Sequence, residues 1–302
     1  MRLIKDKITW YDLYPATEED LNQIKKSFKL NPLTLEELKT PSSRQKVELF
    51  DDFLYVVMRF PVYDHTKKTS APVEIDFLIK PKEIATIRYE KCEPLDEFFK
   101  NAEELEGFRQ KHLANTSAQF LHALLTSLFT YGIRELTHID KKIAEIADLV
   151  FAGKEKDMIK EISLIKRDIL DFRRITKPVE GLLHSLRENS THIYPETEKV
   201  LFLNLLDEYS NLKDLGDNLK DTIESLEVTN QTLLSSKIDE VMRLISILAF
   251  TMAPFTIVGT LFQINTLFTP IIGNPYDWWI ITGISLSGCV LLYLYFKKRN
   301  WL

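Results

Sequence analysis

Near the C-terminal end of the chain, side chains that can contact a hydrated cation share one face of a predicted apolar helix. Successive residues of this face are three or four positions apart, which places them on the same side of a helix: Met242, Ile245, Ala249, Ala253, Thr256, Thr260 and Gln263. The first four are apolar, and the last three carry hydroxyl or amide oxygens. Such a face can line an ion pathway, although Ser and Thr in membrane helices commonly bond to their own backbone or to a neighbouring helix.

Two apolar segments position these side chains. Residues 244–265 and 278–296 each approach the roughly 20 apolar residues that a helix needs to cross a bilayer. Between positions 244 and 296 the only formal charge is that of Asp277. We therefore expect two membrane spans, joined by an external loop at 266–277 and followed by a basic tail at 297–302.

The basic residues predict the orientation of the spans. Lys and Arg near span ends stay on the cytoplasmic side. Lys237 and Arg243 precede the first span, three basic residues occupy 297–299, and the loop at 266–277 has neither Lys nor Arg. Both termini should therefore be cytoplasmic in a cell (inner or plasma) membrane. The aromatic residues at 276, 278 and 279 fit the outer headgroup region.

Composition argues against several other functions. The formal net charge is −5, and three basic residues lie in the short tail, so the remainder is acidic and does not suit nucleic acid. Cys92 and Cys289 are isolated, which excludes a disulfide framework and a Cys-based zinc site. The chain has no glycine-rich phosphate loop and no His-Glu-x-x-His motif, and its His residues lack metal-ligand spacing. We expect neither an enzyme nor an organic cofactor.

The region before the spans divides into two parts. Residues 1–110 mix strand and helix signals and predict an α+β domain with a small antiparallel sheet. The expected strands are 8–14, 47–63, 73–80 and 83–89. Thr17 with Asp20 forms a capping-box pattern for a helix reaching residue 29, and Asn31 with Pro32 begins a short second helix.

Residues 111–243 are predicted to be a helical region and stalk. The expected helices are 117–151, 155–186 and one that begins at 196 and continues into the first span. If unbroken to 265, this last helix is about 105 Å long at 1.5 Å per residue. Gly216 weakens that expectation.

A chain with two spans cannot enclose a pore, because two helices have no interior. A channel therefore requires several copies around an axis. The first span is the candidate for pore lining, and the second suits a lipid-facing helix packed on the first, with its small residues at the contact. These small residues are Gly283, Ser285, Ser287 and Gly288.

Several separated segments resemble the CorA family of magnesium channels. They are DEVMR at 239–243, Pro254 within the first span, YFKKRNWL at 295–302, NPLTLEEL at 31–38 and RQKVELF at 44–50. The resemblance implies a funnel-shaped homopentamer with long stalk helices. It also implies uptake of Mg²⁺, with Co²⁺ and Ni²⁺ as further cargo, down the electrochemical gradient.

The resemblance also implies roles for the apolar tail. Family members end the first span with Gly-Met-Asn, and counting from Pro254 places Gln263, Ile264 and Asn265 there. Asn at this position holds a hydrated ion at the pore mouth in the family, which suits Mg²⁺ because it loses water reluctantly. Met242 and Ile245 correspond to the hydrophobic gate. The pore between gate and mouth would be lined by Ala249, Ala253, Thr256 and Thr260.

A cytoplasmic regulatory metal site is implied as well. Family members sense Mg²⁺ through carboxylates that meet between subunits. Glu36 and Glu37 match one half, but the stalk position is Asn204, and a second acidic position is Thr126. Amide and hydroxyl oxygens are weaker Mg²⁺ ligands than carboxylates, so we expect weak or altered feedback. Asp207, one turn further on, is a substitute ligand.

Two alternatives stay open because the Gly-Met-Asn motif is altered. One is a zinc-transporting, proton-coupled relative resembling ZntB. The other is a membrane-anchored sensor or scaffold that transports nothing. All three readings share the membrane lipid and further copies of the chain as partners.

Overall fold

The computed structural model describes every residue except 65, 114, 265–270 and 300–302. The chain divides into two compact units, Met1–Glu227 and Val228–Leu302. The helix α8 (Lys199–Gln263) belongs to both. Each unit is described separately below.

A six-stranded sheet forms the centre of the first unit, in the order β1-β2-β6-β5-β4-β3. The strands are β1 (Arg2–Lys5), β2 (Thr9–Leu13), β3 (Lys46–Leu49), β4 (Leu54–Asp64), β5 (Thr69–Ile79) and β6 (Glu83–Arg88). The prediction of an antiparallel sheet is wrong at one pair, because β2 and β6 run parallel. Strand β1 was not predicted, since its four residues are mostly charged or exposed.

The predicted strand at 47–63 is two strands. After β3 the chain turns, and the Phe50 N–H donates to the Phe53 carbonyl at 2.9 Å. Asp51 and Asp52 occupy this turn, where short polar side chains are favoured over strand positions. β3 and β4 then pair antiparallel, from Lys46 opposite Val57 to Leu49 opposite Leu54.

The two helix starts predicted before residue 40 are confirmed. Helix α1 (Glu18–Phe28) begins with a capping box in which Thr17 and Asp20 bond each other's backbone N–H. Helix α2 (Pro32–Glu37) begins at Asn31, whose side chain accepts from the Thr34 N–H at 2.7 Å. These caps satisfy N–H groups that the first helical turn leaves without partners.

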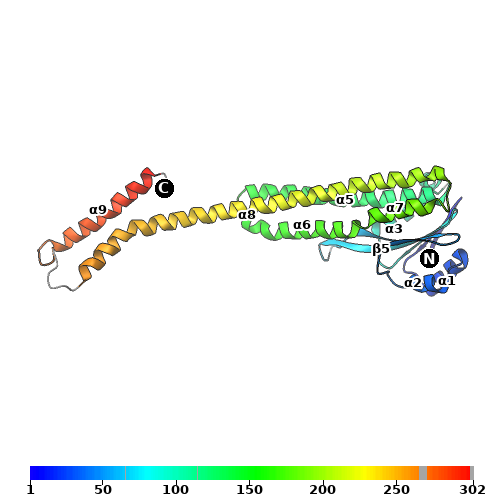
Figure 1. Cartoon of the computed structure of the whole chain (residues 1–302), viewed down its shortest axis with the longest axis horizontal. Helices are drawn as coiled ribbons and strands as arrows, with labels where there is room; N and C mark the ends of the chain where they lie inside the picture. The colour runs from blue at the N-terminus through cyan, green and yellow to red at the C-terminus, as the bar shows by residue number, and fades with distance from the viewer. Residues whose placement is uncertain (65, 114, 265–270, 300–302) are drawn as a thin grey trace. The chain divides into compact units, whose positions relative to one another are not determined.

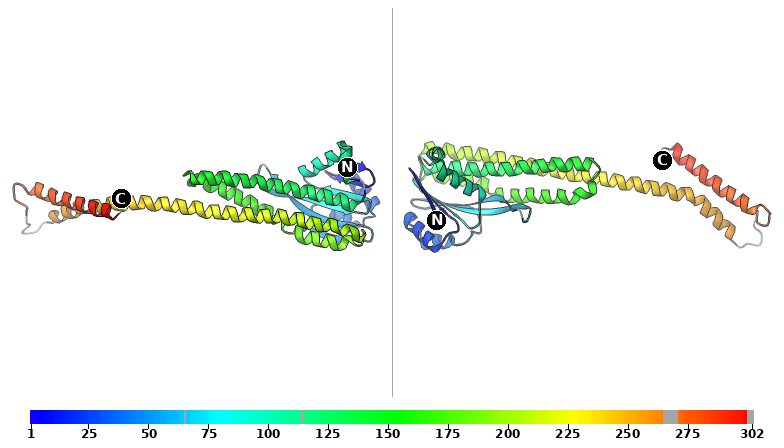
Figure 2. Two further views of the ribbon diagram at one scale, coloured as in Figure 1. Left: turned by 90° about the horizontal axis from the view of Figure 1, so that it is seen from above. Right: turned by 180° about the vertical axis from the view of Figure 1, so that it is seen from behind.

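Helices cover both faces of the sheet (Figures 1 and 2). On one face α1 buries Leu21, Ile24 and Phe28 against strand residues that include Tyr55 and Leu78. The other face is covered by α3 (Glu93–Glu104), α5 (Ser117–Phe151), α6 (Glu155–Thr176) and α7 (Val179–Ser190), with α4 (Glu106–His112) beside α3 and α5. Burial on both faces explains why β4 is mostly apolar and why nearly every residue of β5 is buried.

The predicted helix at 155–186 is broken at Pro178 into α6 and α7. Proline has no N–H and its ring collides with the preceding turn, so a helix interior rarely contains it. A short 3₁₀ turn, Glu196–Glu198, then precedes α8. The prediction that α8 continues unbroken is confirmed as far as Gln263, over 65 residues or about 98 Å, with Gly216 and Pro254 inside it.

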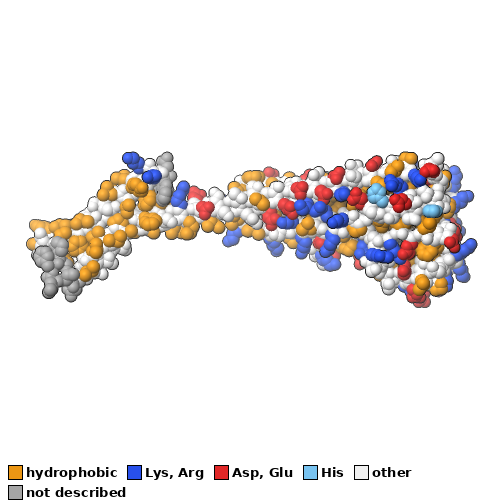
Figure 3. Space-filling view, viewed as in Figure 1, with side chains coloured by type: hydrophobic (Ala, Val, Ile, Leu, Met, Phe, Trp, Pro, Cys, Tyr) orange, Lys and Arg blue, Asp and Glu red, His pale blue; other side chains and the backbone are white. Residues whose placement is uncertain are grey.

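The second unit consists of the C-terminal part of α8 and the helix α9 (Asp277–Lys298). Both helices are long and apolar enough to cross a membrane. Their large apolar side chains are mostly exposed, for example Leu248, Phe255 and Leu291. Figure 3 shows hydrophobic side chains gathered over this unit, whereas charged side chains cover the first.

Candidate ion pathway

Helix α9 packs on α8 at a proline and a glycine. A Cβ added at Gly288 would lie 2.8 Å from Cβ of Pro254, which is closer than real Cβ contacts allow. The glycine therefore leaves the space that the proline ring fills. Pro254 also leaves the Phe250 carbonyl without its usual helical donor, and α8 bends in its C-terminal part (Figure 1).

The same contact extends along both helices. The rings of Phe250 and Phe296 lie 6.3 Å apart. Ile247 on α8 is buried, as is Ser285 on α9, whose hydroxyl donates to the Ile281 carbonyl at 2.9 Å. The predicted packing of small residues is thus confirmed for Ser285 and Gly288. Gly283 differs, because a Cβ there would meet nothing within 4 Å.

The predicted lining residues lie on the other side of α8. A helix turns about 100° per residue, so Thr256 lies about 200° around the axis from Pro254. Met242 and Ile245 are 55% and 54% exposed, Ala249, Thr256, Thr260 and Gln263 are exposed, and Ala253 is half-buried. Within one chain, α9 covers one face of α8 and leaves the candidate lining face free.

Both threonine hydroxyls on this face bond to their own helix. Thr256 Oγ1 donates to the Ala253 carbonyl, and Thr260 Oγ1 donates to the Ile257 carbonyl, each at 2.9 Å. The hydroxyl proton is therefore engaged, and the oxygen lone pairs remain available to accept hydrogen bonds. An acceptor oxygen suits water molecules bound to a cation.

The first two residues of the predicted pore-mouth triplet lie at the end of α8. Gln263 is the last residue of the helix, and the exposed Ile264 follows it, with its N–H donating to the Leu261 carbonyl at 3.4 Å. Asn265, the residue predicted to meet the ion, lies outside the described residues.

The predicted regulatory carboxylates on α2 form ion pairs with lysines. Glu36 binds Lys39 at 2.6 Å, and Glu37 binds Lys46 at 2.7 Å. Lys46 also binds Glu48 at 3.0 Å. Burial lowers the pKa of Lys46, but the hydrogen bonds to both glutamates outweigh it and raise the pKa overall.

One chain does not bring the two halves of the predicted regulatory site together. Asn204 and Asp207 are exposed on α8, which lies on the opposite side of the sheet from α2 (Figures 1 and 2). Thr126 is half-buried on α5, and its hydroxyl oxygen has no hydrogen-bond partner among the described residues. These residues can meet Glu36 and Glu37 only in a second subunit.

A buried carboxylate on β5 was not predicted. Asp76 on β5 is fully buried, and its Oδ2 accepts from the hydroxyls of Tyr55 and Tyr89 at 3.0 Å each. Its Oδ1 has no hydrogen-bond partner among the described residues. Burial, followed by the nearby charge of Glu74, raises the pKa of Asp76 to about 7. The acidic residues Glu74 and Asp76 among the apolar residues of β5 were the available sequence signal.

Comparison with known proteins identifies the family. The model of the CorA-like Mg²⁺ transporter protein family matches residues 5–298. The chain belongs to this family. The cobalt/magnesium transport protein CorA of Thermotoga maritima is 22% identical over 296 residues, covering 97% of this chain and 83% of that protein. With two apolar helices, this CorA-like chain is a membrane protein.

Solved structures share the fold. The CorA magnesium transporter from Methanocaldococcus jannaschii superposes with a TM-score of 0.83 at 17% identity, covering all of this chain and 94% of that one. The cytoplasmic domain of ZntB from Vibrio parahaemolyticus has a TM-score of 0.55 at 13% identity, over 77% of this chain and 90% of its own. The predicted architecture of an α+β domain, stalk helices and two C-terminal spans is therefore confirmed.

Proposed function

We propose that this CorA-like chain assembles as a homopentameric membrane channel that admits divalent cations, with Mg²⁺ as the principal cargo and Co²⁺ and Ni²⁺ as further ones. The proposal depends on one observation: helix α9 covers only one face of α8. Because α9 packs on the face of Pro254, the face of Thr256, Thr260 and Gln263 is free to meet its copies around an axis. Relatives named as magnesium and cobalt transporters support the cargo.

In this assembly the lining face supplies a gate and a mouth. Met242 and Ile245 form apolar rings that close the pore by excluding water. Ala249, Ala253, Thr256 and Thr260 line the path beyond them. Gln263, Ile264 and Asn265 form the outer mouth, where amide oxygens bind the water shell of the ion. Both termini lie in the cytoplasm, so an inside-negative potential drives uptake by about 4.6 kcal/mol per 100 mV for a divalent ion.

In this assembly, Mg²⁺ bound on the cytoplasmic side inhibits the channel only weakly. Glu36 and Glu37 of one subunit face Asn204 and Asp207 of the next, and only three of these four side chains are carboxylates. The lysine pairs of both glutamates compete with a bound cation. Internal Mg²⁺ at sub-millimolar concentration should therefore inhibit little, and sharp inhibition in that range contradicts this part of the proposal.

Flux into liposomes tests the function. Purified full-length protein should pass Mg²⁺ down a gradient, and Asn265→Ala should reduce the flux while leaving the detergent-corrected mass unchanged. A protein that passes none of Mg²⁺, Co²⁺, Ni²⁺ and Zn²⁺ is the sensor or scaffold.

A zinc-transporting, proton-coupled activity is the second candidate. The observation that favours it is the replacement of Gly-Met by Gln263-Ile264 at the mouth. The likeness to the ZntB domain concerns only the fold. Zn²⁺ flux that responds to a pH gradient, with little Mg²⁺ flux, would establish this candidate instead.

A further inference from the structure

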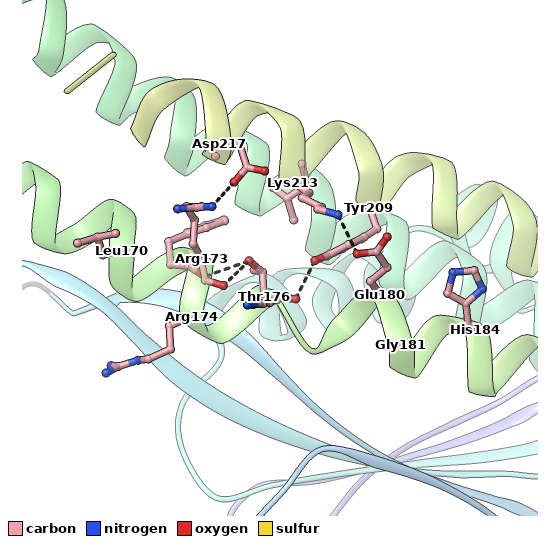
Figure 4. A pocket seen from close by; sticks show the side chains of 14 residues that line it. Leu170, Arg173, Arg174, Thr176, Glu180, Gly181, His184, Tyr209, Lys213 and Asp217 are labelled. Carbon is pink, nitrogen blue, oxygen red and sulfur yellow. Dashed lines mark hydrogen bonds and ion pairs between the residues drawn. The ribbon is translucent and has the colours of Figure 1, made fainter. Parts of the chain in front are cut away.

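A cleft in the first unit lies between α8 and the junction of α6 and α7 (Figure 4). Its volume is about 720 Å³, within the range of about 300–1,000 Å³ that is usual for small-molecule sites. The break between α6 and α7 at Pro178 lies beside the cleft. α6 ends at Thr176, whose carbonyl accepts from the Tyr209 hydroxyl of α8 at 2.9 Å.

The floor of the cleft is apolar and closely packed. Phe172, Tyr209 and Leu212 are only 1%, 2% and 2% exposed, so they form a solid base that the protein covers almost completely. The accessible apolar surface of the floor comes from Leu170, which is 42% exposed. Two glycines widen the walls above this floor. A Cβ at Gly181 would meet nothing within 4 Å, and one at Gly216 would make only ordinary contacts, the nearest at 3.6 Å. A flat organic group has both a surface and room here.

The rim of the cleft is basic although the whole chain is acidic. Arg173, Arg174, Lys177 and Lys213 line it with two acids, Glu180 and Asp217, in a chain of net charge −5. Arg174 also pairs with Asp171, outside the lining, at 2.9 Å, so Lys177 supplies the excess positive charge. His184 lies on the α7 wall (Figure 4). A local excess of positive charge in an acidic protein attracts an anion to this position.

Two ion pairs cross the mouth of the cleft. Arg173 on α6 binds Asp217 on α8 at 2.6 Å, and Lys213 on α8 binds Glu180 on α7 at 2.8 Å (Figure 4). All four side chains are 35–47% exposed, and ion pairs this exposed contribute little to stability. A phosphate carries more charge and more acceptor oxygens than one carboxylate. It can therefore replace Asp217 and Glu180 as the partner of the Arg173 guanidinium and the Lys213 ammonium.

We propose that this cleft binds an organic phosphate of nucleotide size, with the phosphate at Arg173 and Lys213 and the organic part on the apolar floor. Such a ligand uses both the basic rim and the apolar floor of the cleft. The phosphate explains the basic rim, and the organic part explains the floor and the missing side chains at Gly181 and Gly216. The bound ligand bridges α8 to α6 and α7.

Adenosine monophosphate (AMP) is the probe, titrated calorimetrically into the full-length protein in detergent with a chelator that removes divalent metals. We expect a Kd below about 1 mM, and at least about tenfold weaker binding for both adenosine and inorganic phosphate, which each lack one half of the probe. Absence of AMP binding at millimolar concentration overturns the proposal. Binding of inorganic phosphate as tight as that of AMP also overturns it, since the floor then contributes nothing.

Gly181→Leu tests the location. The side chain has room to enter the cleft, and leucine favours the helix over glycine, so the variant should fold and bind AMP at least about tenfold more weakly. Gly107→Leu is the matched control, because a Cβ at Gly107 also meets nothing within 4 Å. Unchanged AMP binding by Gly181→Leu contradicts the proposed location.

Two further measurements complete the test. Lys213→Gln should weaken AMP binding, whereas Lys220→Gln, which breaks the ion pairs of a lysine outside the cleft on the same helix, should not. The detergent-corrected mass of Gly181→Leu should equal that of the wild type. Loss of assembly in this variant would mean that a second copy fills the cleft, and would overturn the proposal. None of these readouts depends on ion flux.

Discussion

Apolar side chains are buried in the first unit and exposed in the second, and helix α8 runs through both units. In the first unit α8 buries Leu205, Leu212 and Leu219 against its neighbours. In the second unit the same helix exposes Leu244, Leu248 and Leu261. Water cannot be the solvent around the second pattern, since exposed apolar patches of that extent are not found on soluble monomers. The comparison shows that one part of the continuous helix α8 suits water and the other suits the apolar interior of a membrane.

Replacing a tryptophan by alanine should reduce stability far more in the first unit than in the second. Trp10 is fully buried, with ring centroids 4.9 Å from Phe99 and 4.8 Å from Phe120. Trp10→Ala should destabilise the first unit by about 3–5 kcal/mol, because it leaves a cavity. Trp279 is 69% exposed, and Trp279→Ala should cost less than about 1 kcal/mol. Thermal unfolding in detergent measures both, and equal losses would refute the contrast.

Asp76 should make the stability of the first unit depend on pH. Its pKa is raised to about 7 in the folded protein from an ordinary value of 3.8, so the folded form holds the proton between these values. The stabilisation is complete below about pH 4 and is lost as the pH rises through 7, by at most about 4 kcal/mol. Burial comes first among the causes, and Glu74 second.

Asp76→Asn should remove this dependence, because an amide carries no charge at either pH. The variant should be more stable than the wild type at pH 8, measured by urea unfolding across a pH series. No acidic residue among the described residues of the second unit is buried, so its own unfolding should not follow the same curve. A wild type whose stability rises between pH 5 and 8 would contradict the assignment.

Gly288→Leu should separate the two helices of the second unit. Its Cβ would fall 2.8 Å from Pro254, and such overpacking typically costs about 1–3 kcal/mol. Gly283→Leu is the control, because the space around Gly283 is open. Comparison of the detergent-corrected mass and the melting temperature of both variants decides the matter. Equal behaviour would mean that α9 does not rest on the proline.

Thr256→Val should have the smallest effect on stability and a selective one on transport. The hydroxyl bonds only to its own helix, so its loss should change the free energy of unfolding by less than about 0.5 kcal/mol. Divalent flux should fall, since a methyl group replaces an acceptor on the lining face. A clear loss of stability with normal flux would instead assign Thr256 to helix packing.

Sequence patterns predicted the parts of the fold that local chemistry decides. The caps at Thr17 and Asn31, the long helix at 117–151 and the two apolar helices required only neighbouring residues. The parallel pairing of β2 with β6 was missed, because it joins strands about 75 residues apart and depends on tertiary contacts. The break at Pro178 was missed although the residue itself predicts it.

The candidate site was predicted less completely than the fold. Helical spacing identified a face of α8, and the small residues of α9 indicated a contact, but neither pattern pairs Gly288 with Pro254. The roles of Met242, Ile245 and the triplet at 263–265 stay predictions, since they depend on copies of the chain around an axis. Asp76 was overlooked because a carboxylate in a strand does not by itself indicate burial.

The continuity of α8 restricts how this protein can change in length. Each residue added between the two units turns everything after it by about 100° and advances it by about 1.5 Å. One residue inserted at 228–243 would turn the face of Thr256 and Thr260 by about 100°, away from the pore axis. Two inserted residues would turn it by about 200°, to nearly the opposite side of the helix. Seven residues bring the face back to within about 20°. Relatives should therefore differ in this segment by numbers of residues close to whole turns, and in a series of one to seven alanine insertions the seventh should restore ion flux best.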